Sequence, residues 1–149
     1  MAGRDLQGID HTLQLTHEWV AELRDRLGWT SSRDAMRLMR TVLTELRDRL
    51  PHAEAADLAA RMPLLIRGMY YEGWQPARTP IPERAGEGFE VAVEARLGRL
   101  DGYRGRADIE AVFATLANRM GEGEMARARR ALPRAVRDLW PPETVRGPD

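Results

Sequence analysis

The chain has 149 residues with 23 basic and 23 acidic side chains, so its formal net charge is zero. Every base is arginine and there is no cysteine, which excludes disulfides and thiolate metal sites. A balanced charge also excludes the global electrostatic field that is typical of a nucleic-acid or membrane-surface binder. A chain of this length buries roughly 70% of its unfolded surface, so hydrophobic packing alone can hold it together.

No segment predicts export or membrane insertion. The first 15 residues lack the apolar stretch of a signal peptide, and no apolar run approaches the ~20 residues that span a bilayer. We therefore expect a cytoplasmic protein that does not contact a membrane.

The N-terminal region is expected to be a loose arm over residues 1–15. Its apolar anchors are Ile9, Leu13 and Leu15. So few anchors predict an arm that packs late onto the body of the protein. A helix is expected over about 17–27, where apolar residues recur at three- and four-residue spacing.

A second helix is expected between the candidate cap residues Ser31 and Ser32 and the proline that ends it, Pro51. Its apolar residues form one stripe along about four turns, and this stripe predicts a core-facing side. The opposite side is interpreted as an ordinary solvated face, formed by Arg37, Arg40, Glu45, Arg47 and Asp48.

The longest apolar run predicts a third helix over about 53–72, buried on most sides. Pro63 lies inside it. The ring of Pro63 opposes the carbonyl group of Ala59, and a proline has no backbone N–H, so we expect a kink or a break at this point.

The second half begins after a linker rich in proline, glycine and charge over residues 74–88. Three more helices are expected over about 89–97, 109–120 and 123–140. The last of them contains Pro133. Residues 141–149 are expected to form a disordered tail.

The two halves align without a gap when the chain is shifted by 70 residues. The matched pairs include Val42 with Val112, Leu46 with Leu116, Met62-Pro63 with Leu132-Pro133, and Arg67 with Arg137. No segment has the alternating pattern of a strand. The sequence therefore predicts an all-α six-helix bundle made of two tandem three-helix repeats, residues 16–73 and 89–140. The third helix of each repeat is expected to be kinked, at Pro63 and Pro133, and to lie at the interface that the repeats share.

Three segments, residues 15–29, 46–76 and 121–141, resemble the bacterial domain-of-unknown-function family 2267. The most specific elements are Met62-Pro63 and the run from Arg67 to Trp74. The resemblance implies a small helical bacterial protein with two related halves. It implies no reaction, cofactor or substrate.

The first candidate site is the end of the third helix, where Arg67, Tyr70, Tyr71 and Trp74 are concentrated. Partly exposed aromatic and arginine side chains are typical of protein-interaction hot spots. The alternative is structural: Tyr70 aligns with Trp140 in the repeat, and both rings can cover an end of the bundle.

Arg67 and Arg137 occupy the same position in both halves, four residues after the proline. A partly buried guanidinium needs an acceptor. The carbonyl groups freed by Pro63 and Pro133 can supply it, as can Glu54 and Glu124. Because both halves keep the arginine, a structural role is favoured over substrate binding.

The second candidate site is a row of arginines on the last predicted helix, formed by Arg127, Arg130, Arg134 and Arg137. Such a row can bind the phosphate groups of a nucleic acid or another anionic polymer. The alternative is a plain solvated face, which the zero net charge favours.

Catalytic and metal-binding patterns are missing from the sequence. The three histidines, His11, His17 and His52, have no helical ligand spacing, and there is no glycine-rich phosphate loop or nucleophile motif. We therefore expect no cofactor and no catalysis. The leading hypothesis is an interaction module that binds a protein partner or itself. The alternatives are anionic-polymer binding and a small-ligand pocket or active site between the halves.

Overall fold

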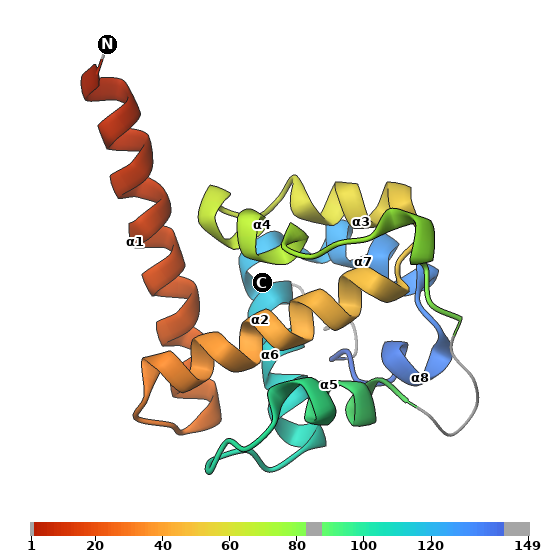
Figure 1. The fold of residues 1–149 in the computed structure, drawn as a ribbon. Coiled ribbons are helices and arrows are strands. Elements are labelled where there is room, and N and C mark those ends of the chain that lie inside the picture. Colours follow the sequence, from red (N-terminus) through yellow and green to blue (C-terminus); the bar gives the residue numbers. More distant parts are fainter. Residues whose placement is uncertain (1, 83–87, 142–149) are drawn as a thin grey trace, which may run out of the picture.

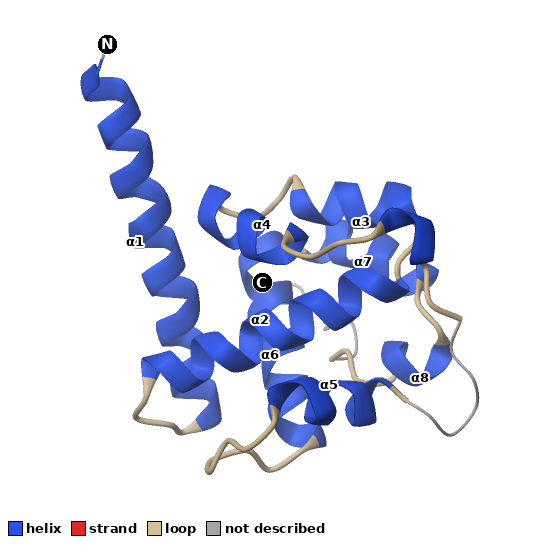
Figure 2. Ribbon diagram, viewed as in Figure 1, coloured by secondary structure: helices blue, strands red, loops and turns tan. Residues whose placement is uncertain are grey.

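The computed structural model describes residues 2–82 and 88–141, without the side chains of residues 2–5 and 122. Within these ranges the regular elements are α-helices and one 3-10 turn, with no strand (Figure 2). The predicted all-α class is therefore confirmed. The elements are α1 (Ala2–Leu27), α2 (Ser32–Arg49), α3 (His52–Ala59), α4 (Leu64–Tyr71), the 3-10 turn η1 (Pro76–Arg78), α5 (Phe89–Leu97), α6 (Arg106–Met120), α7 (Glu122–Ala131) and α8 (Arg134–Arg137).

Helix α1 is longer than the sequence suggested. Residues 2–15 are helical, so the expectation of an irregular segment there is wrong. The N-terminal end of α1 extends away from the other helices (Figure 1), whereas Thr12 contacts α4 through the backbone N–H of Leu65. Leu6, Ile9 and Leu13 keep the three- and four-residue spacing of the rest of α1, and this spacing is the helical signal within an otherwise polar segment.

Helix α2 is the central element, since it packs against α1, α4, α5 and α6. Every residue from 41 to 50 is buried, including Glu45, Arg47 and Asp48. The prediction of a solvated face is therefore wrong for this end of the helix. The chain that follows α4 covers it, and the backbone N–H of Ile81 donates to the carbonyl of Asp48 at 2.7 Å. Helical periodicity cannot reveal coverage by an irregular segment.

The two proline-containing helices are each divided into two helices. Pro63 lies between α3 and α4 with φ −54° and ψ 149°, and Pro133 lies between α7 and α8 with φ −55° and ψ 149°. These are extended conformations, so the chain breaks at both prolines instead of kinking, and the described residues contain eight α-helices where six were expected. The cause is the missing N–H and the bulk of the proline ring.

Helix α3 packs against α7, so the segments before the two prolines lie side by side, as the sequence led us to expect (Figure 1). Buried apolar residues from both halves form one continuous core. The first part of the predicted linker, residues 74–82, is described and lies against α2 and α3. Residues 83–87, and the predicted tail after Pro141, lie outside the described residues.

Candidate functional site

The aromatic segment that the sequence singled out is mostly engaged inside the protein. Tyr70 is fully buried, and its hydroxyl donates to the carbonyl of Ala55 at 2.9 Å. Tyr71 and Trp74 are half-buried, and their ring centroids lie 5.5 Å apart. Burial raises the pKa of Tyr70 above its ordinary value. This ring therefore belongs to the core, and only its two neighbours keep an exposed edge.

Trp74 holds the segment after α4 against the start of α3. Its Nε1 donates to Thr79 Oγ1 at 3.2 Å, and its ring meets the His52 ring edge-on at 5.5 Å between centroids. The Nε2 atom of His52 lies 2.9 Å from the carbonyl oxygens of Pro76 and Thr79. These contacts give Trp74 a structural role that does not depend on a partner.

Arg67 bridges the break at Pro63. Its Nε donates to the carbonyl of Ala59 at 2.9 Å, and its Nη2 donates to the carbonyl of Met62 at 3.0 Å. Carbonyl oxygens are therefore the acceptors of Arg67, one of the two alternatives that the sequence offered. Arg137, its counterpart in the second half, makes no such bond within the described part of the chain.

Arg47, on α2, is a buried arginine that the sequence pattern did not reveal. Arg47 is 2% exposed, and its Nη1 donates to the carbonyl oxygens of Tyr70 and Glu72, both at 2.8 Å. Its Nε and Nη2 donate to the carboxylate of Asp48 at 2.9 and 2.8 Å. The guanidinium thereby ties the end of α4 to the middle of the fold. The only signal in the sequence was the density of charge just before the proline that ends α2.

The four arginines predicted to form one row do not share one helix. Arg127 and Arg130 lie on α7, Arg134 and Arg137 lie on α8, and the extended backbone at Pro133 separates the pairs. The expectation of a single helical row is therefore wrong. The first three side chains are exposed and Arg137 is half-buried.

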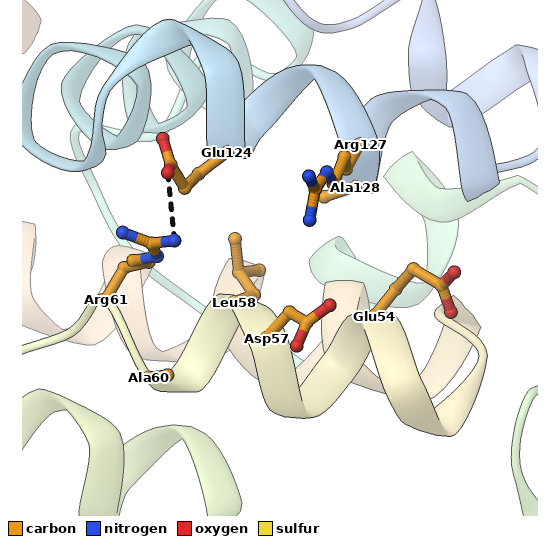
Figure 3. Close-up of a pocket in the computed structure, with 8 residues that line it drawn as sticks. All are labelled: Glu54, Asp57, Leu58, Ala60, Arg61, Glu124, Arg127 and Ala128. Carbon is orange, nitrogen blue, oxygen red and sulfur yellow. Dashed lines mark ion pairs between the residues drawn. The ribbon is translucent and has the colours of Figure 1, made fainter.

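A pocket of about 240 Å³ lies between α3 and α7, the helices that come from the two halves. Arg61, in the turn that follows α3, pairs with Glu124 of α7 at 2.9 Å across it (Figure 3). Arg127 projects from α7 toward α3, and Asp57 faces it from α3 (Figure 3). Charges of both signs therefore line a small opening between the halves.

A second exposed feature is apolar. Leu6, Ile9 and Leu13 of α1 are 59%, 51% and 42% exposed, and Leu64 and Leu65 of α4 are 64% and 39% exposed. We call these five residues the α1–α4 apolar surface. The sequence named Ile9 and Leu13 only as anchors of an arm, and it placed Leu64 and Leu65 in a buried helix.

The two parts of the α1–α4 apolar surface adjoin each other. The backbone N–H of Leu65 donates to Thr12 Oγ1 at 3.0 Å. A shallow groove of about 330 Å³ runs beside this contact, lined by Thr12, Leu64, Leu65, Gly68, Met69 and Glu72. Thr12 therefore joins the protruding half of α1 to the groove on α4.

Two other kinds of site receive no support from the described residues. No helix there combines the length and the apolar composition needed to cross a membrane. Nor do three or more histidine, aspartate or glutamate side chains converge there in a way that suits a metal ion.

The fold and these surfaces define an all-helical protein that has exposed apolar and mixed-charge faces. A family model described as an uncharacterized conserved protein (DUF2267) matches residues 16–139, which is most of the chain. The protein belongs to this family. A comparison with curated proteins finds no match.

Proposed function

We propose that this protein is a non-enzymatic helical interaction module and that it binds a protein through the α1–α4 apolar surface. The observation that carries the proposal is the exposure of five large aliphatic side chains on one face. Contiguous apolar patches on monomers seldom exceed a few hundred Å², and larger ones mark interaction sites. This proposal moves the interface from the Arg67 to Trp74 segment to the surface beside it.

The energetic reason is the gain that burial of this face offers. Full burial of a leucine or isoleucine is worth about 1.5–3 kcal/mol, so side chains that are about half exposed retain roughly half of that gain for a partner. The groove beside Leu65 adds a concave seat, which improves the packing of an inserted side chain.

The test compares proteins captured from the native host by the tagged chain and by two variants. Leu6→Glu with Ile9→Glu places charge on the apolar face and keeps a good helix former at both positions. Val91→Glu is the control, because Val91 is 61% exposed on α5, away from that face. We expect a partner to be captured by the wild type and by the control but lost with the double variant. Equal capture by all three would contradict the proposal.

A second candidate function is binding of a small ligand between the halves, in the α3–α7 pocket. Its support is a volume of about 240 Å³ with Arg127 and Asp57 facing each other across it. A ligand that carries both a positive and a negative group suits these side chains. A thermal-shift screen of such compounds tests it: any true ligand should lose its effect in Arg127→Ala and keep it in Arg134→Ala.

A third candidate is binding of an anionic polymer by the arginines of α7 and α8. Arg127, Arg130 and Arg134 are exposed and make no ion pair with the described residues. Elution from heparin at rising salt tests it. Phosphate binding predicts strongly salt-dependent retention that falls when all three are replaced by glutamine. No retention at low salt would exclude it.

We also infer that the fold arose by tandem duplication with an offset of 70 residues, from two three-helix repeats whose third helices are now divided. The matching backbone angles at Pro63 and Pro133 support this inference, as does the packing of α3 on α7. The absence of cysteine is consistent with a cytoplasmic location, which we retain as part of the proposal.

A further inference from the structure

We propose that the occupant of the α1–α4 apolar surface is a second copy of this chain, joined about a two-fold axis. The proposal rests on the proposed function and names its partner. In such a contact each copy offers the protruding half of α1 and receives the other copy's helix beside Leu64 and Leu65.

The first observation is the continuity of one stripe along α1. Positions at alternating spacings of three and four residues, the pattern of a helix-pairing seam, are all aliphatic except for one threonine: Leu6, Ile9, Leu13, Thr16, Val20, Leu23 and Leu27. The last four are buried at 0–4% exposure, whereas the first three are 42–59% exposed. A seam that is packed over its C-terminal half and bare over its N-terminal half lacks one partner helix.

The second observation is that one molecule carries both a projecting helix and a groove. The bare half of α1 projects beyond the body (Figure 1), and the groove of about 330 Å³ on α4 lies directly beside it, joined through Thr12. A face that holds both a projecting helix and a groove is complementary to its own copy when rotated by half a turn. A different partner would have to supply both shapes.

The third observation is area. Five side chains that are each about half exposed leave several hundred Å² of apolar surface, at the upper end for a typical monomer. Both copies together would bury on the order of 1,000 Å² before any polar rim is counted. With that rim the contact reaches the ~1,200–2,000 Å² of specific protein interfaces.

The fourth observation is charge. A two-fold contact brings like next to like, so a strongly charged face would repel itself. Among residues 6–17, Asp10 is the one acidic residue, and arginine is absent. On the α4 side the groove is lined by Glu72, which pairs with Arg40, so identical copies of this face can meet without strong repulsion.

The experiment is sedimentation equilibrium of the full chain over a range of concentrations. The wild type and Val91→Glu are expected at twice the 16.9 kDa monomer mass at micromolar concentration. Leu6→Glu with Ile9→Glu should raise the dissociation constant at least about 100-fold, and so should Leu64→Glu on the other part of the surface. All four substituted positions are exposed, and circular dichroism checks that each variant retains its helices.

Three results overturn the proposal, and the first two separate it from the proposed function. A wild type that is monomeric throughout, but captures another protein through Leu6 and Ile9, excludes self-association and leaves the interaction module intact. A monomeric wild type whose captured proteins are unchanged by the Leu6 and Ile9 substitutions excludes both. A dimer that the Leu6 and Ile9 substitutions do not weaken also overturns the proposal, because its interface then lies elsewhere.

Discussion

The guanidinium of Arg67 donates a hydrogen bond from Nε to the carbonyl oxygen of Ala59 across the break between α3 and α4. In an uninterrupted helix this carbonyl would accept from the N–H of residue 63, which proline does not have. Arg67 therefore gives this carbonyl a charged donor beside the backbone N–H of Met62, which also donates to it at 3.0 Å, and its Nη2 donates to the carbonyl of Met62. One arginine side chain thereby bridges the break on both sides.

Replacement of Arg67 by methionine should destabilise the fold by about 1–3 kcal/mol, because two partly buried carbonyl groups lose a charged donor. Arg67→Lys should recover only part of this loss, since an ammonium group lacks the planar fork that reaches both acceptors. Urea unfolding followed by circular dichroism measures the free energies. The exposed Arg134→Met is the matched control and should change stability by less than about 0.5 kcal/mol. A similar loss in both variants would show that the bridge contributes nothing specific.

Replacement of Arg47 by methionine should be more damaging, with a loss of about 3–5 kcal/mol. The side chain is 2% exposed, and its removal leaves Asp48 as a buried charge without its partner and two carbonyl groups without a donor. Chemical denaturation of both variants on the same α2 helix makes the comparison. Arg40→Met breaks only an exposed pair with Glu72 and should cost no more than about 1 kcal/mol. A loss of stability in Arg40→Met as large as that in Arg47→Met would contradict the prediction.

Stability should fall in alkaline solution because two tyrosines resist ionisation in the folded state. Burial raises the pKa of Tyr70 above its ordinary value of 10.0. Burial, with the nearby carboxylates of Glu94 and Asp108, raises the pKa of Tyr103 to about 12. A raised folded-state pKa means that the unfolded chain loses its proton first, so the stabilisation is complete below pH 10 and is lost as pH rises above it. Urea midpoints measured between pH 8 and 12 should show this decline.

Tyr70→Phe identifies the contribution of the buried ring to this decline. At neutral pH the free energy of unfolding of the variant should be about 0.5–1.5 kcal/mol lower, because the Ala55 carbonyl loses the hydrogen bond from the Tyr70 hydroxyl. Above pH 10 the variant should lose stability less steeply than the wild type, so the two curves converge. Parallel curves would mean that the pKa of Tyr70 is the same in the folded and the unfolded state.

The ion pair between Arg61 and Glu124 spans the α3–α7 pocket, and we expect its contribution to stability to be small. Its side chains are 51% and 36% exposed, so solvent screens the pair. A double-mutant cycle with Arg61→Met and Glu124→Gln should give a coupling energy below about 1 kcal/mol that shrinks in high salt. A coupling that is larger, or that does not depend on salt, would mean that the pocket is more rigid and less hydrated than its exposure indicates.

Much of the fold was accessible from the sequence because helical periodicity and proline chemistry are local. The apolar stripes predicted helices at the positions of α2, α5 and α6, and Pro63 and Pro133 marked the two places where a predicted helix is interrupted. One of the two alternatives for the acceptor of Arg67, the carbonyl of Ala59, followed from the fixed spacing between a proline and the carbonyl that its ring opposes. The candidate surfaces were harder to predict from the sequence. Whether Leu64 faces a core or solvent depends on which helix lies opposite.

Composition and pattern determined by themselves that this protein is all-helical and that it holds together without disulfides or thiolate metal sites. Tertiary structure alone decided that Arg47 and Asp48 are buried, that the arginines of α7 and α8 separate, and that the stripe on α1 continues beyond the body. The physical reason is the separation in sequence over which each effect acts. Periodicity records the preference of one helix for an apolar environment, whereas burial and exposure depend on chain segments far away in sequence.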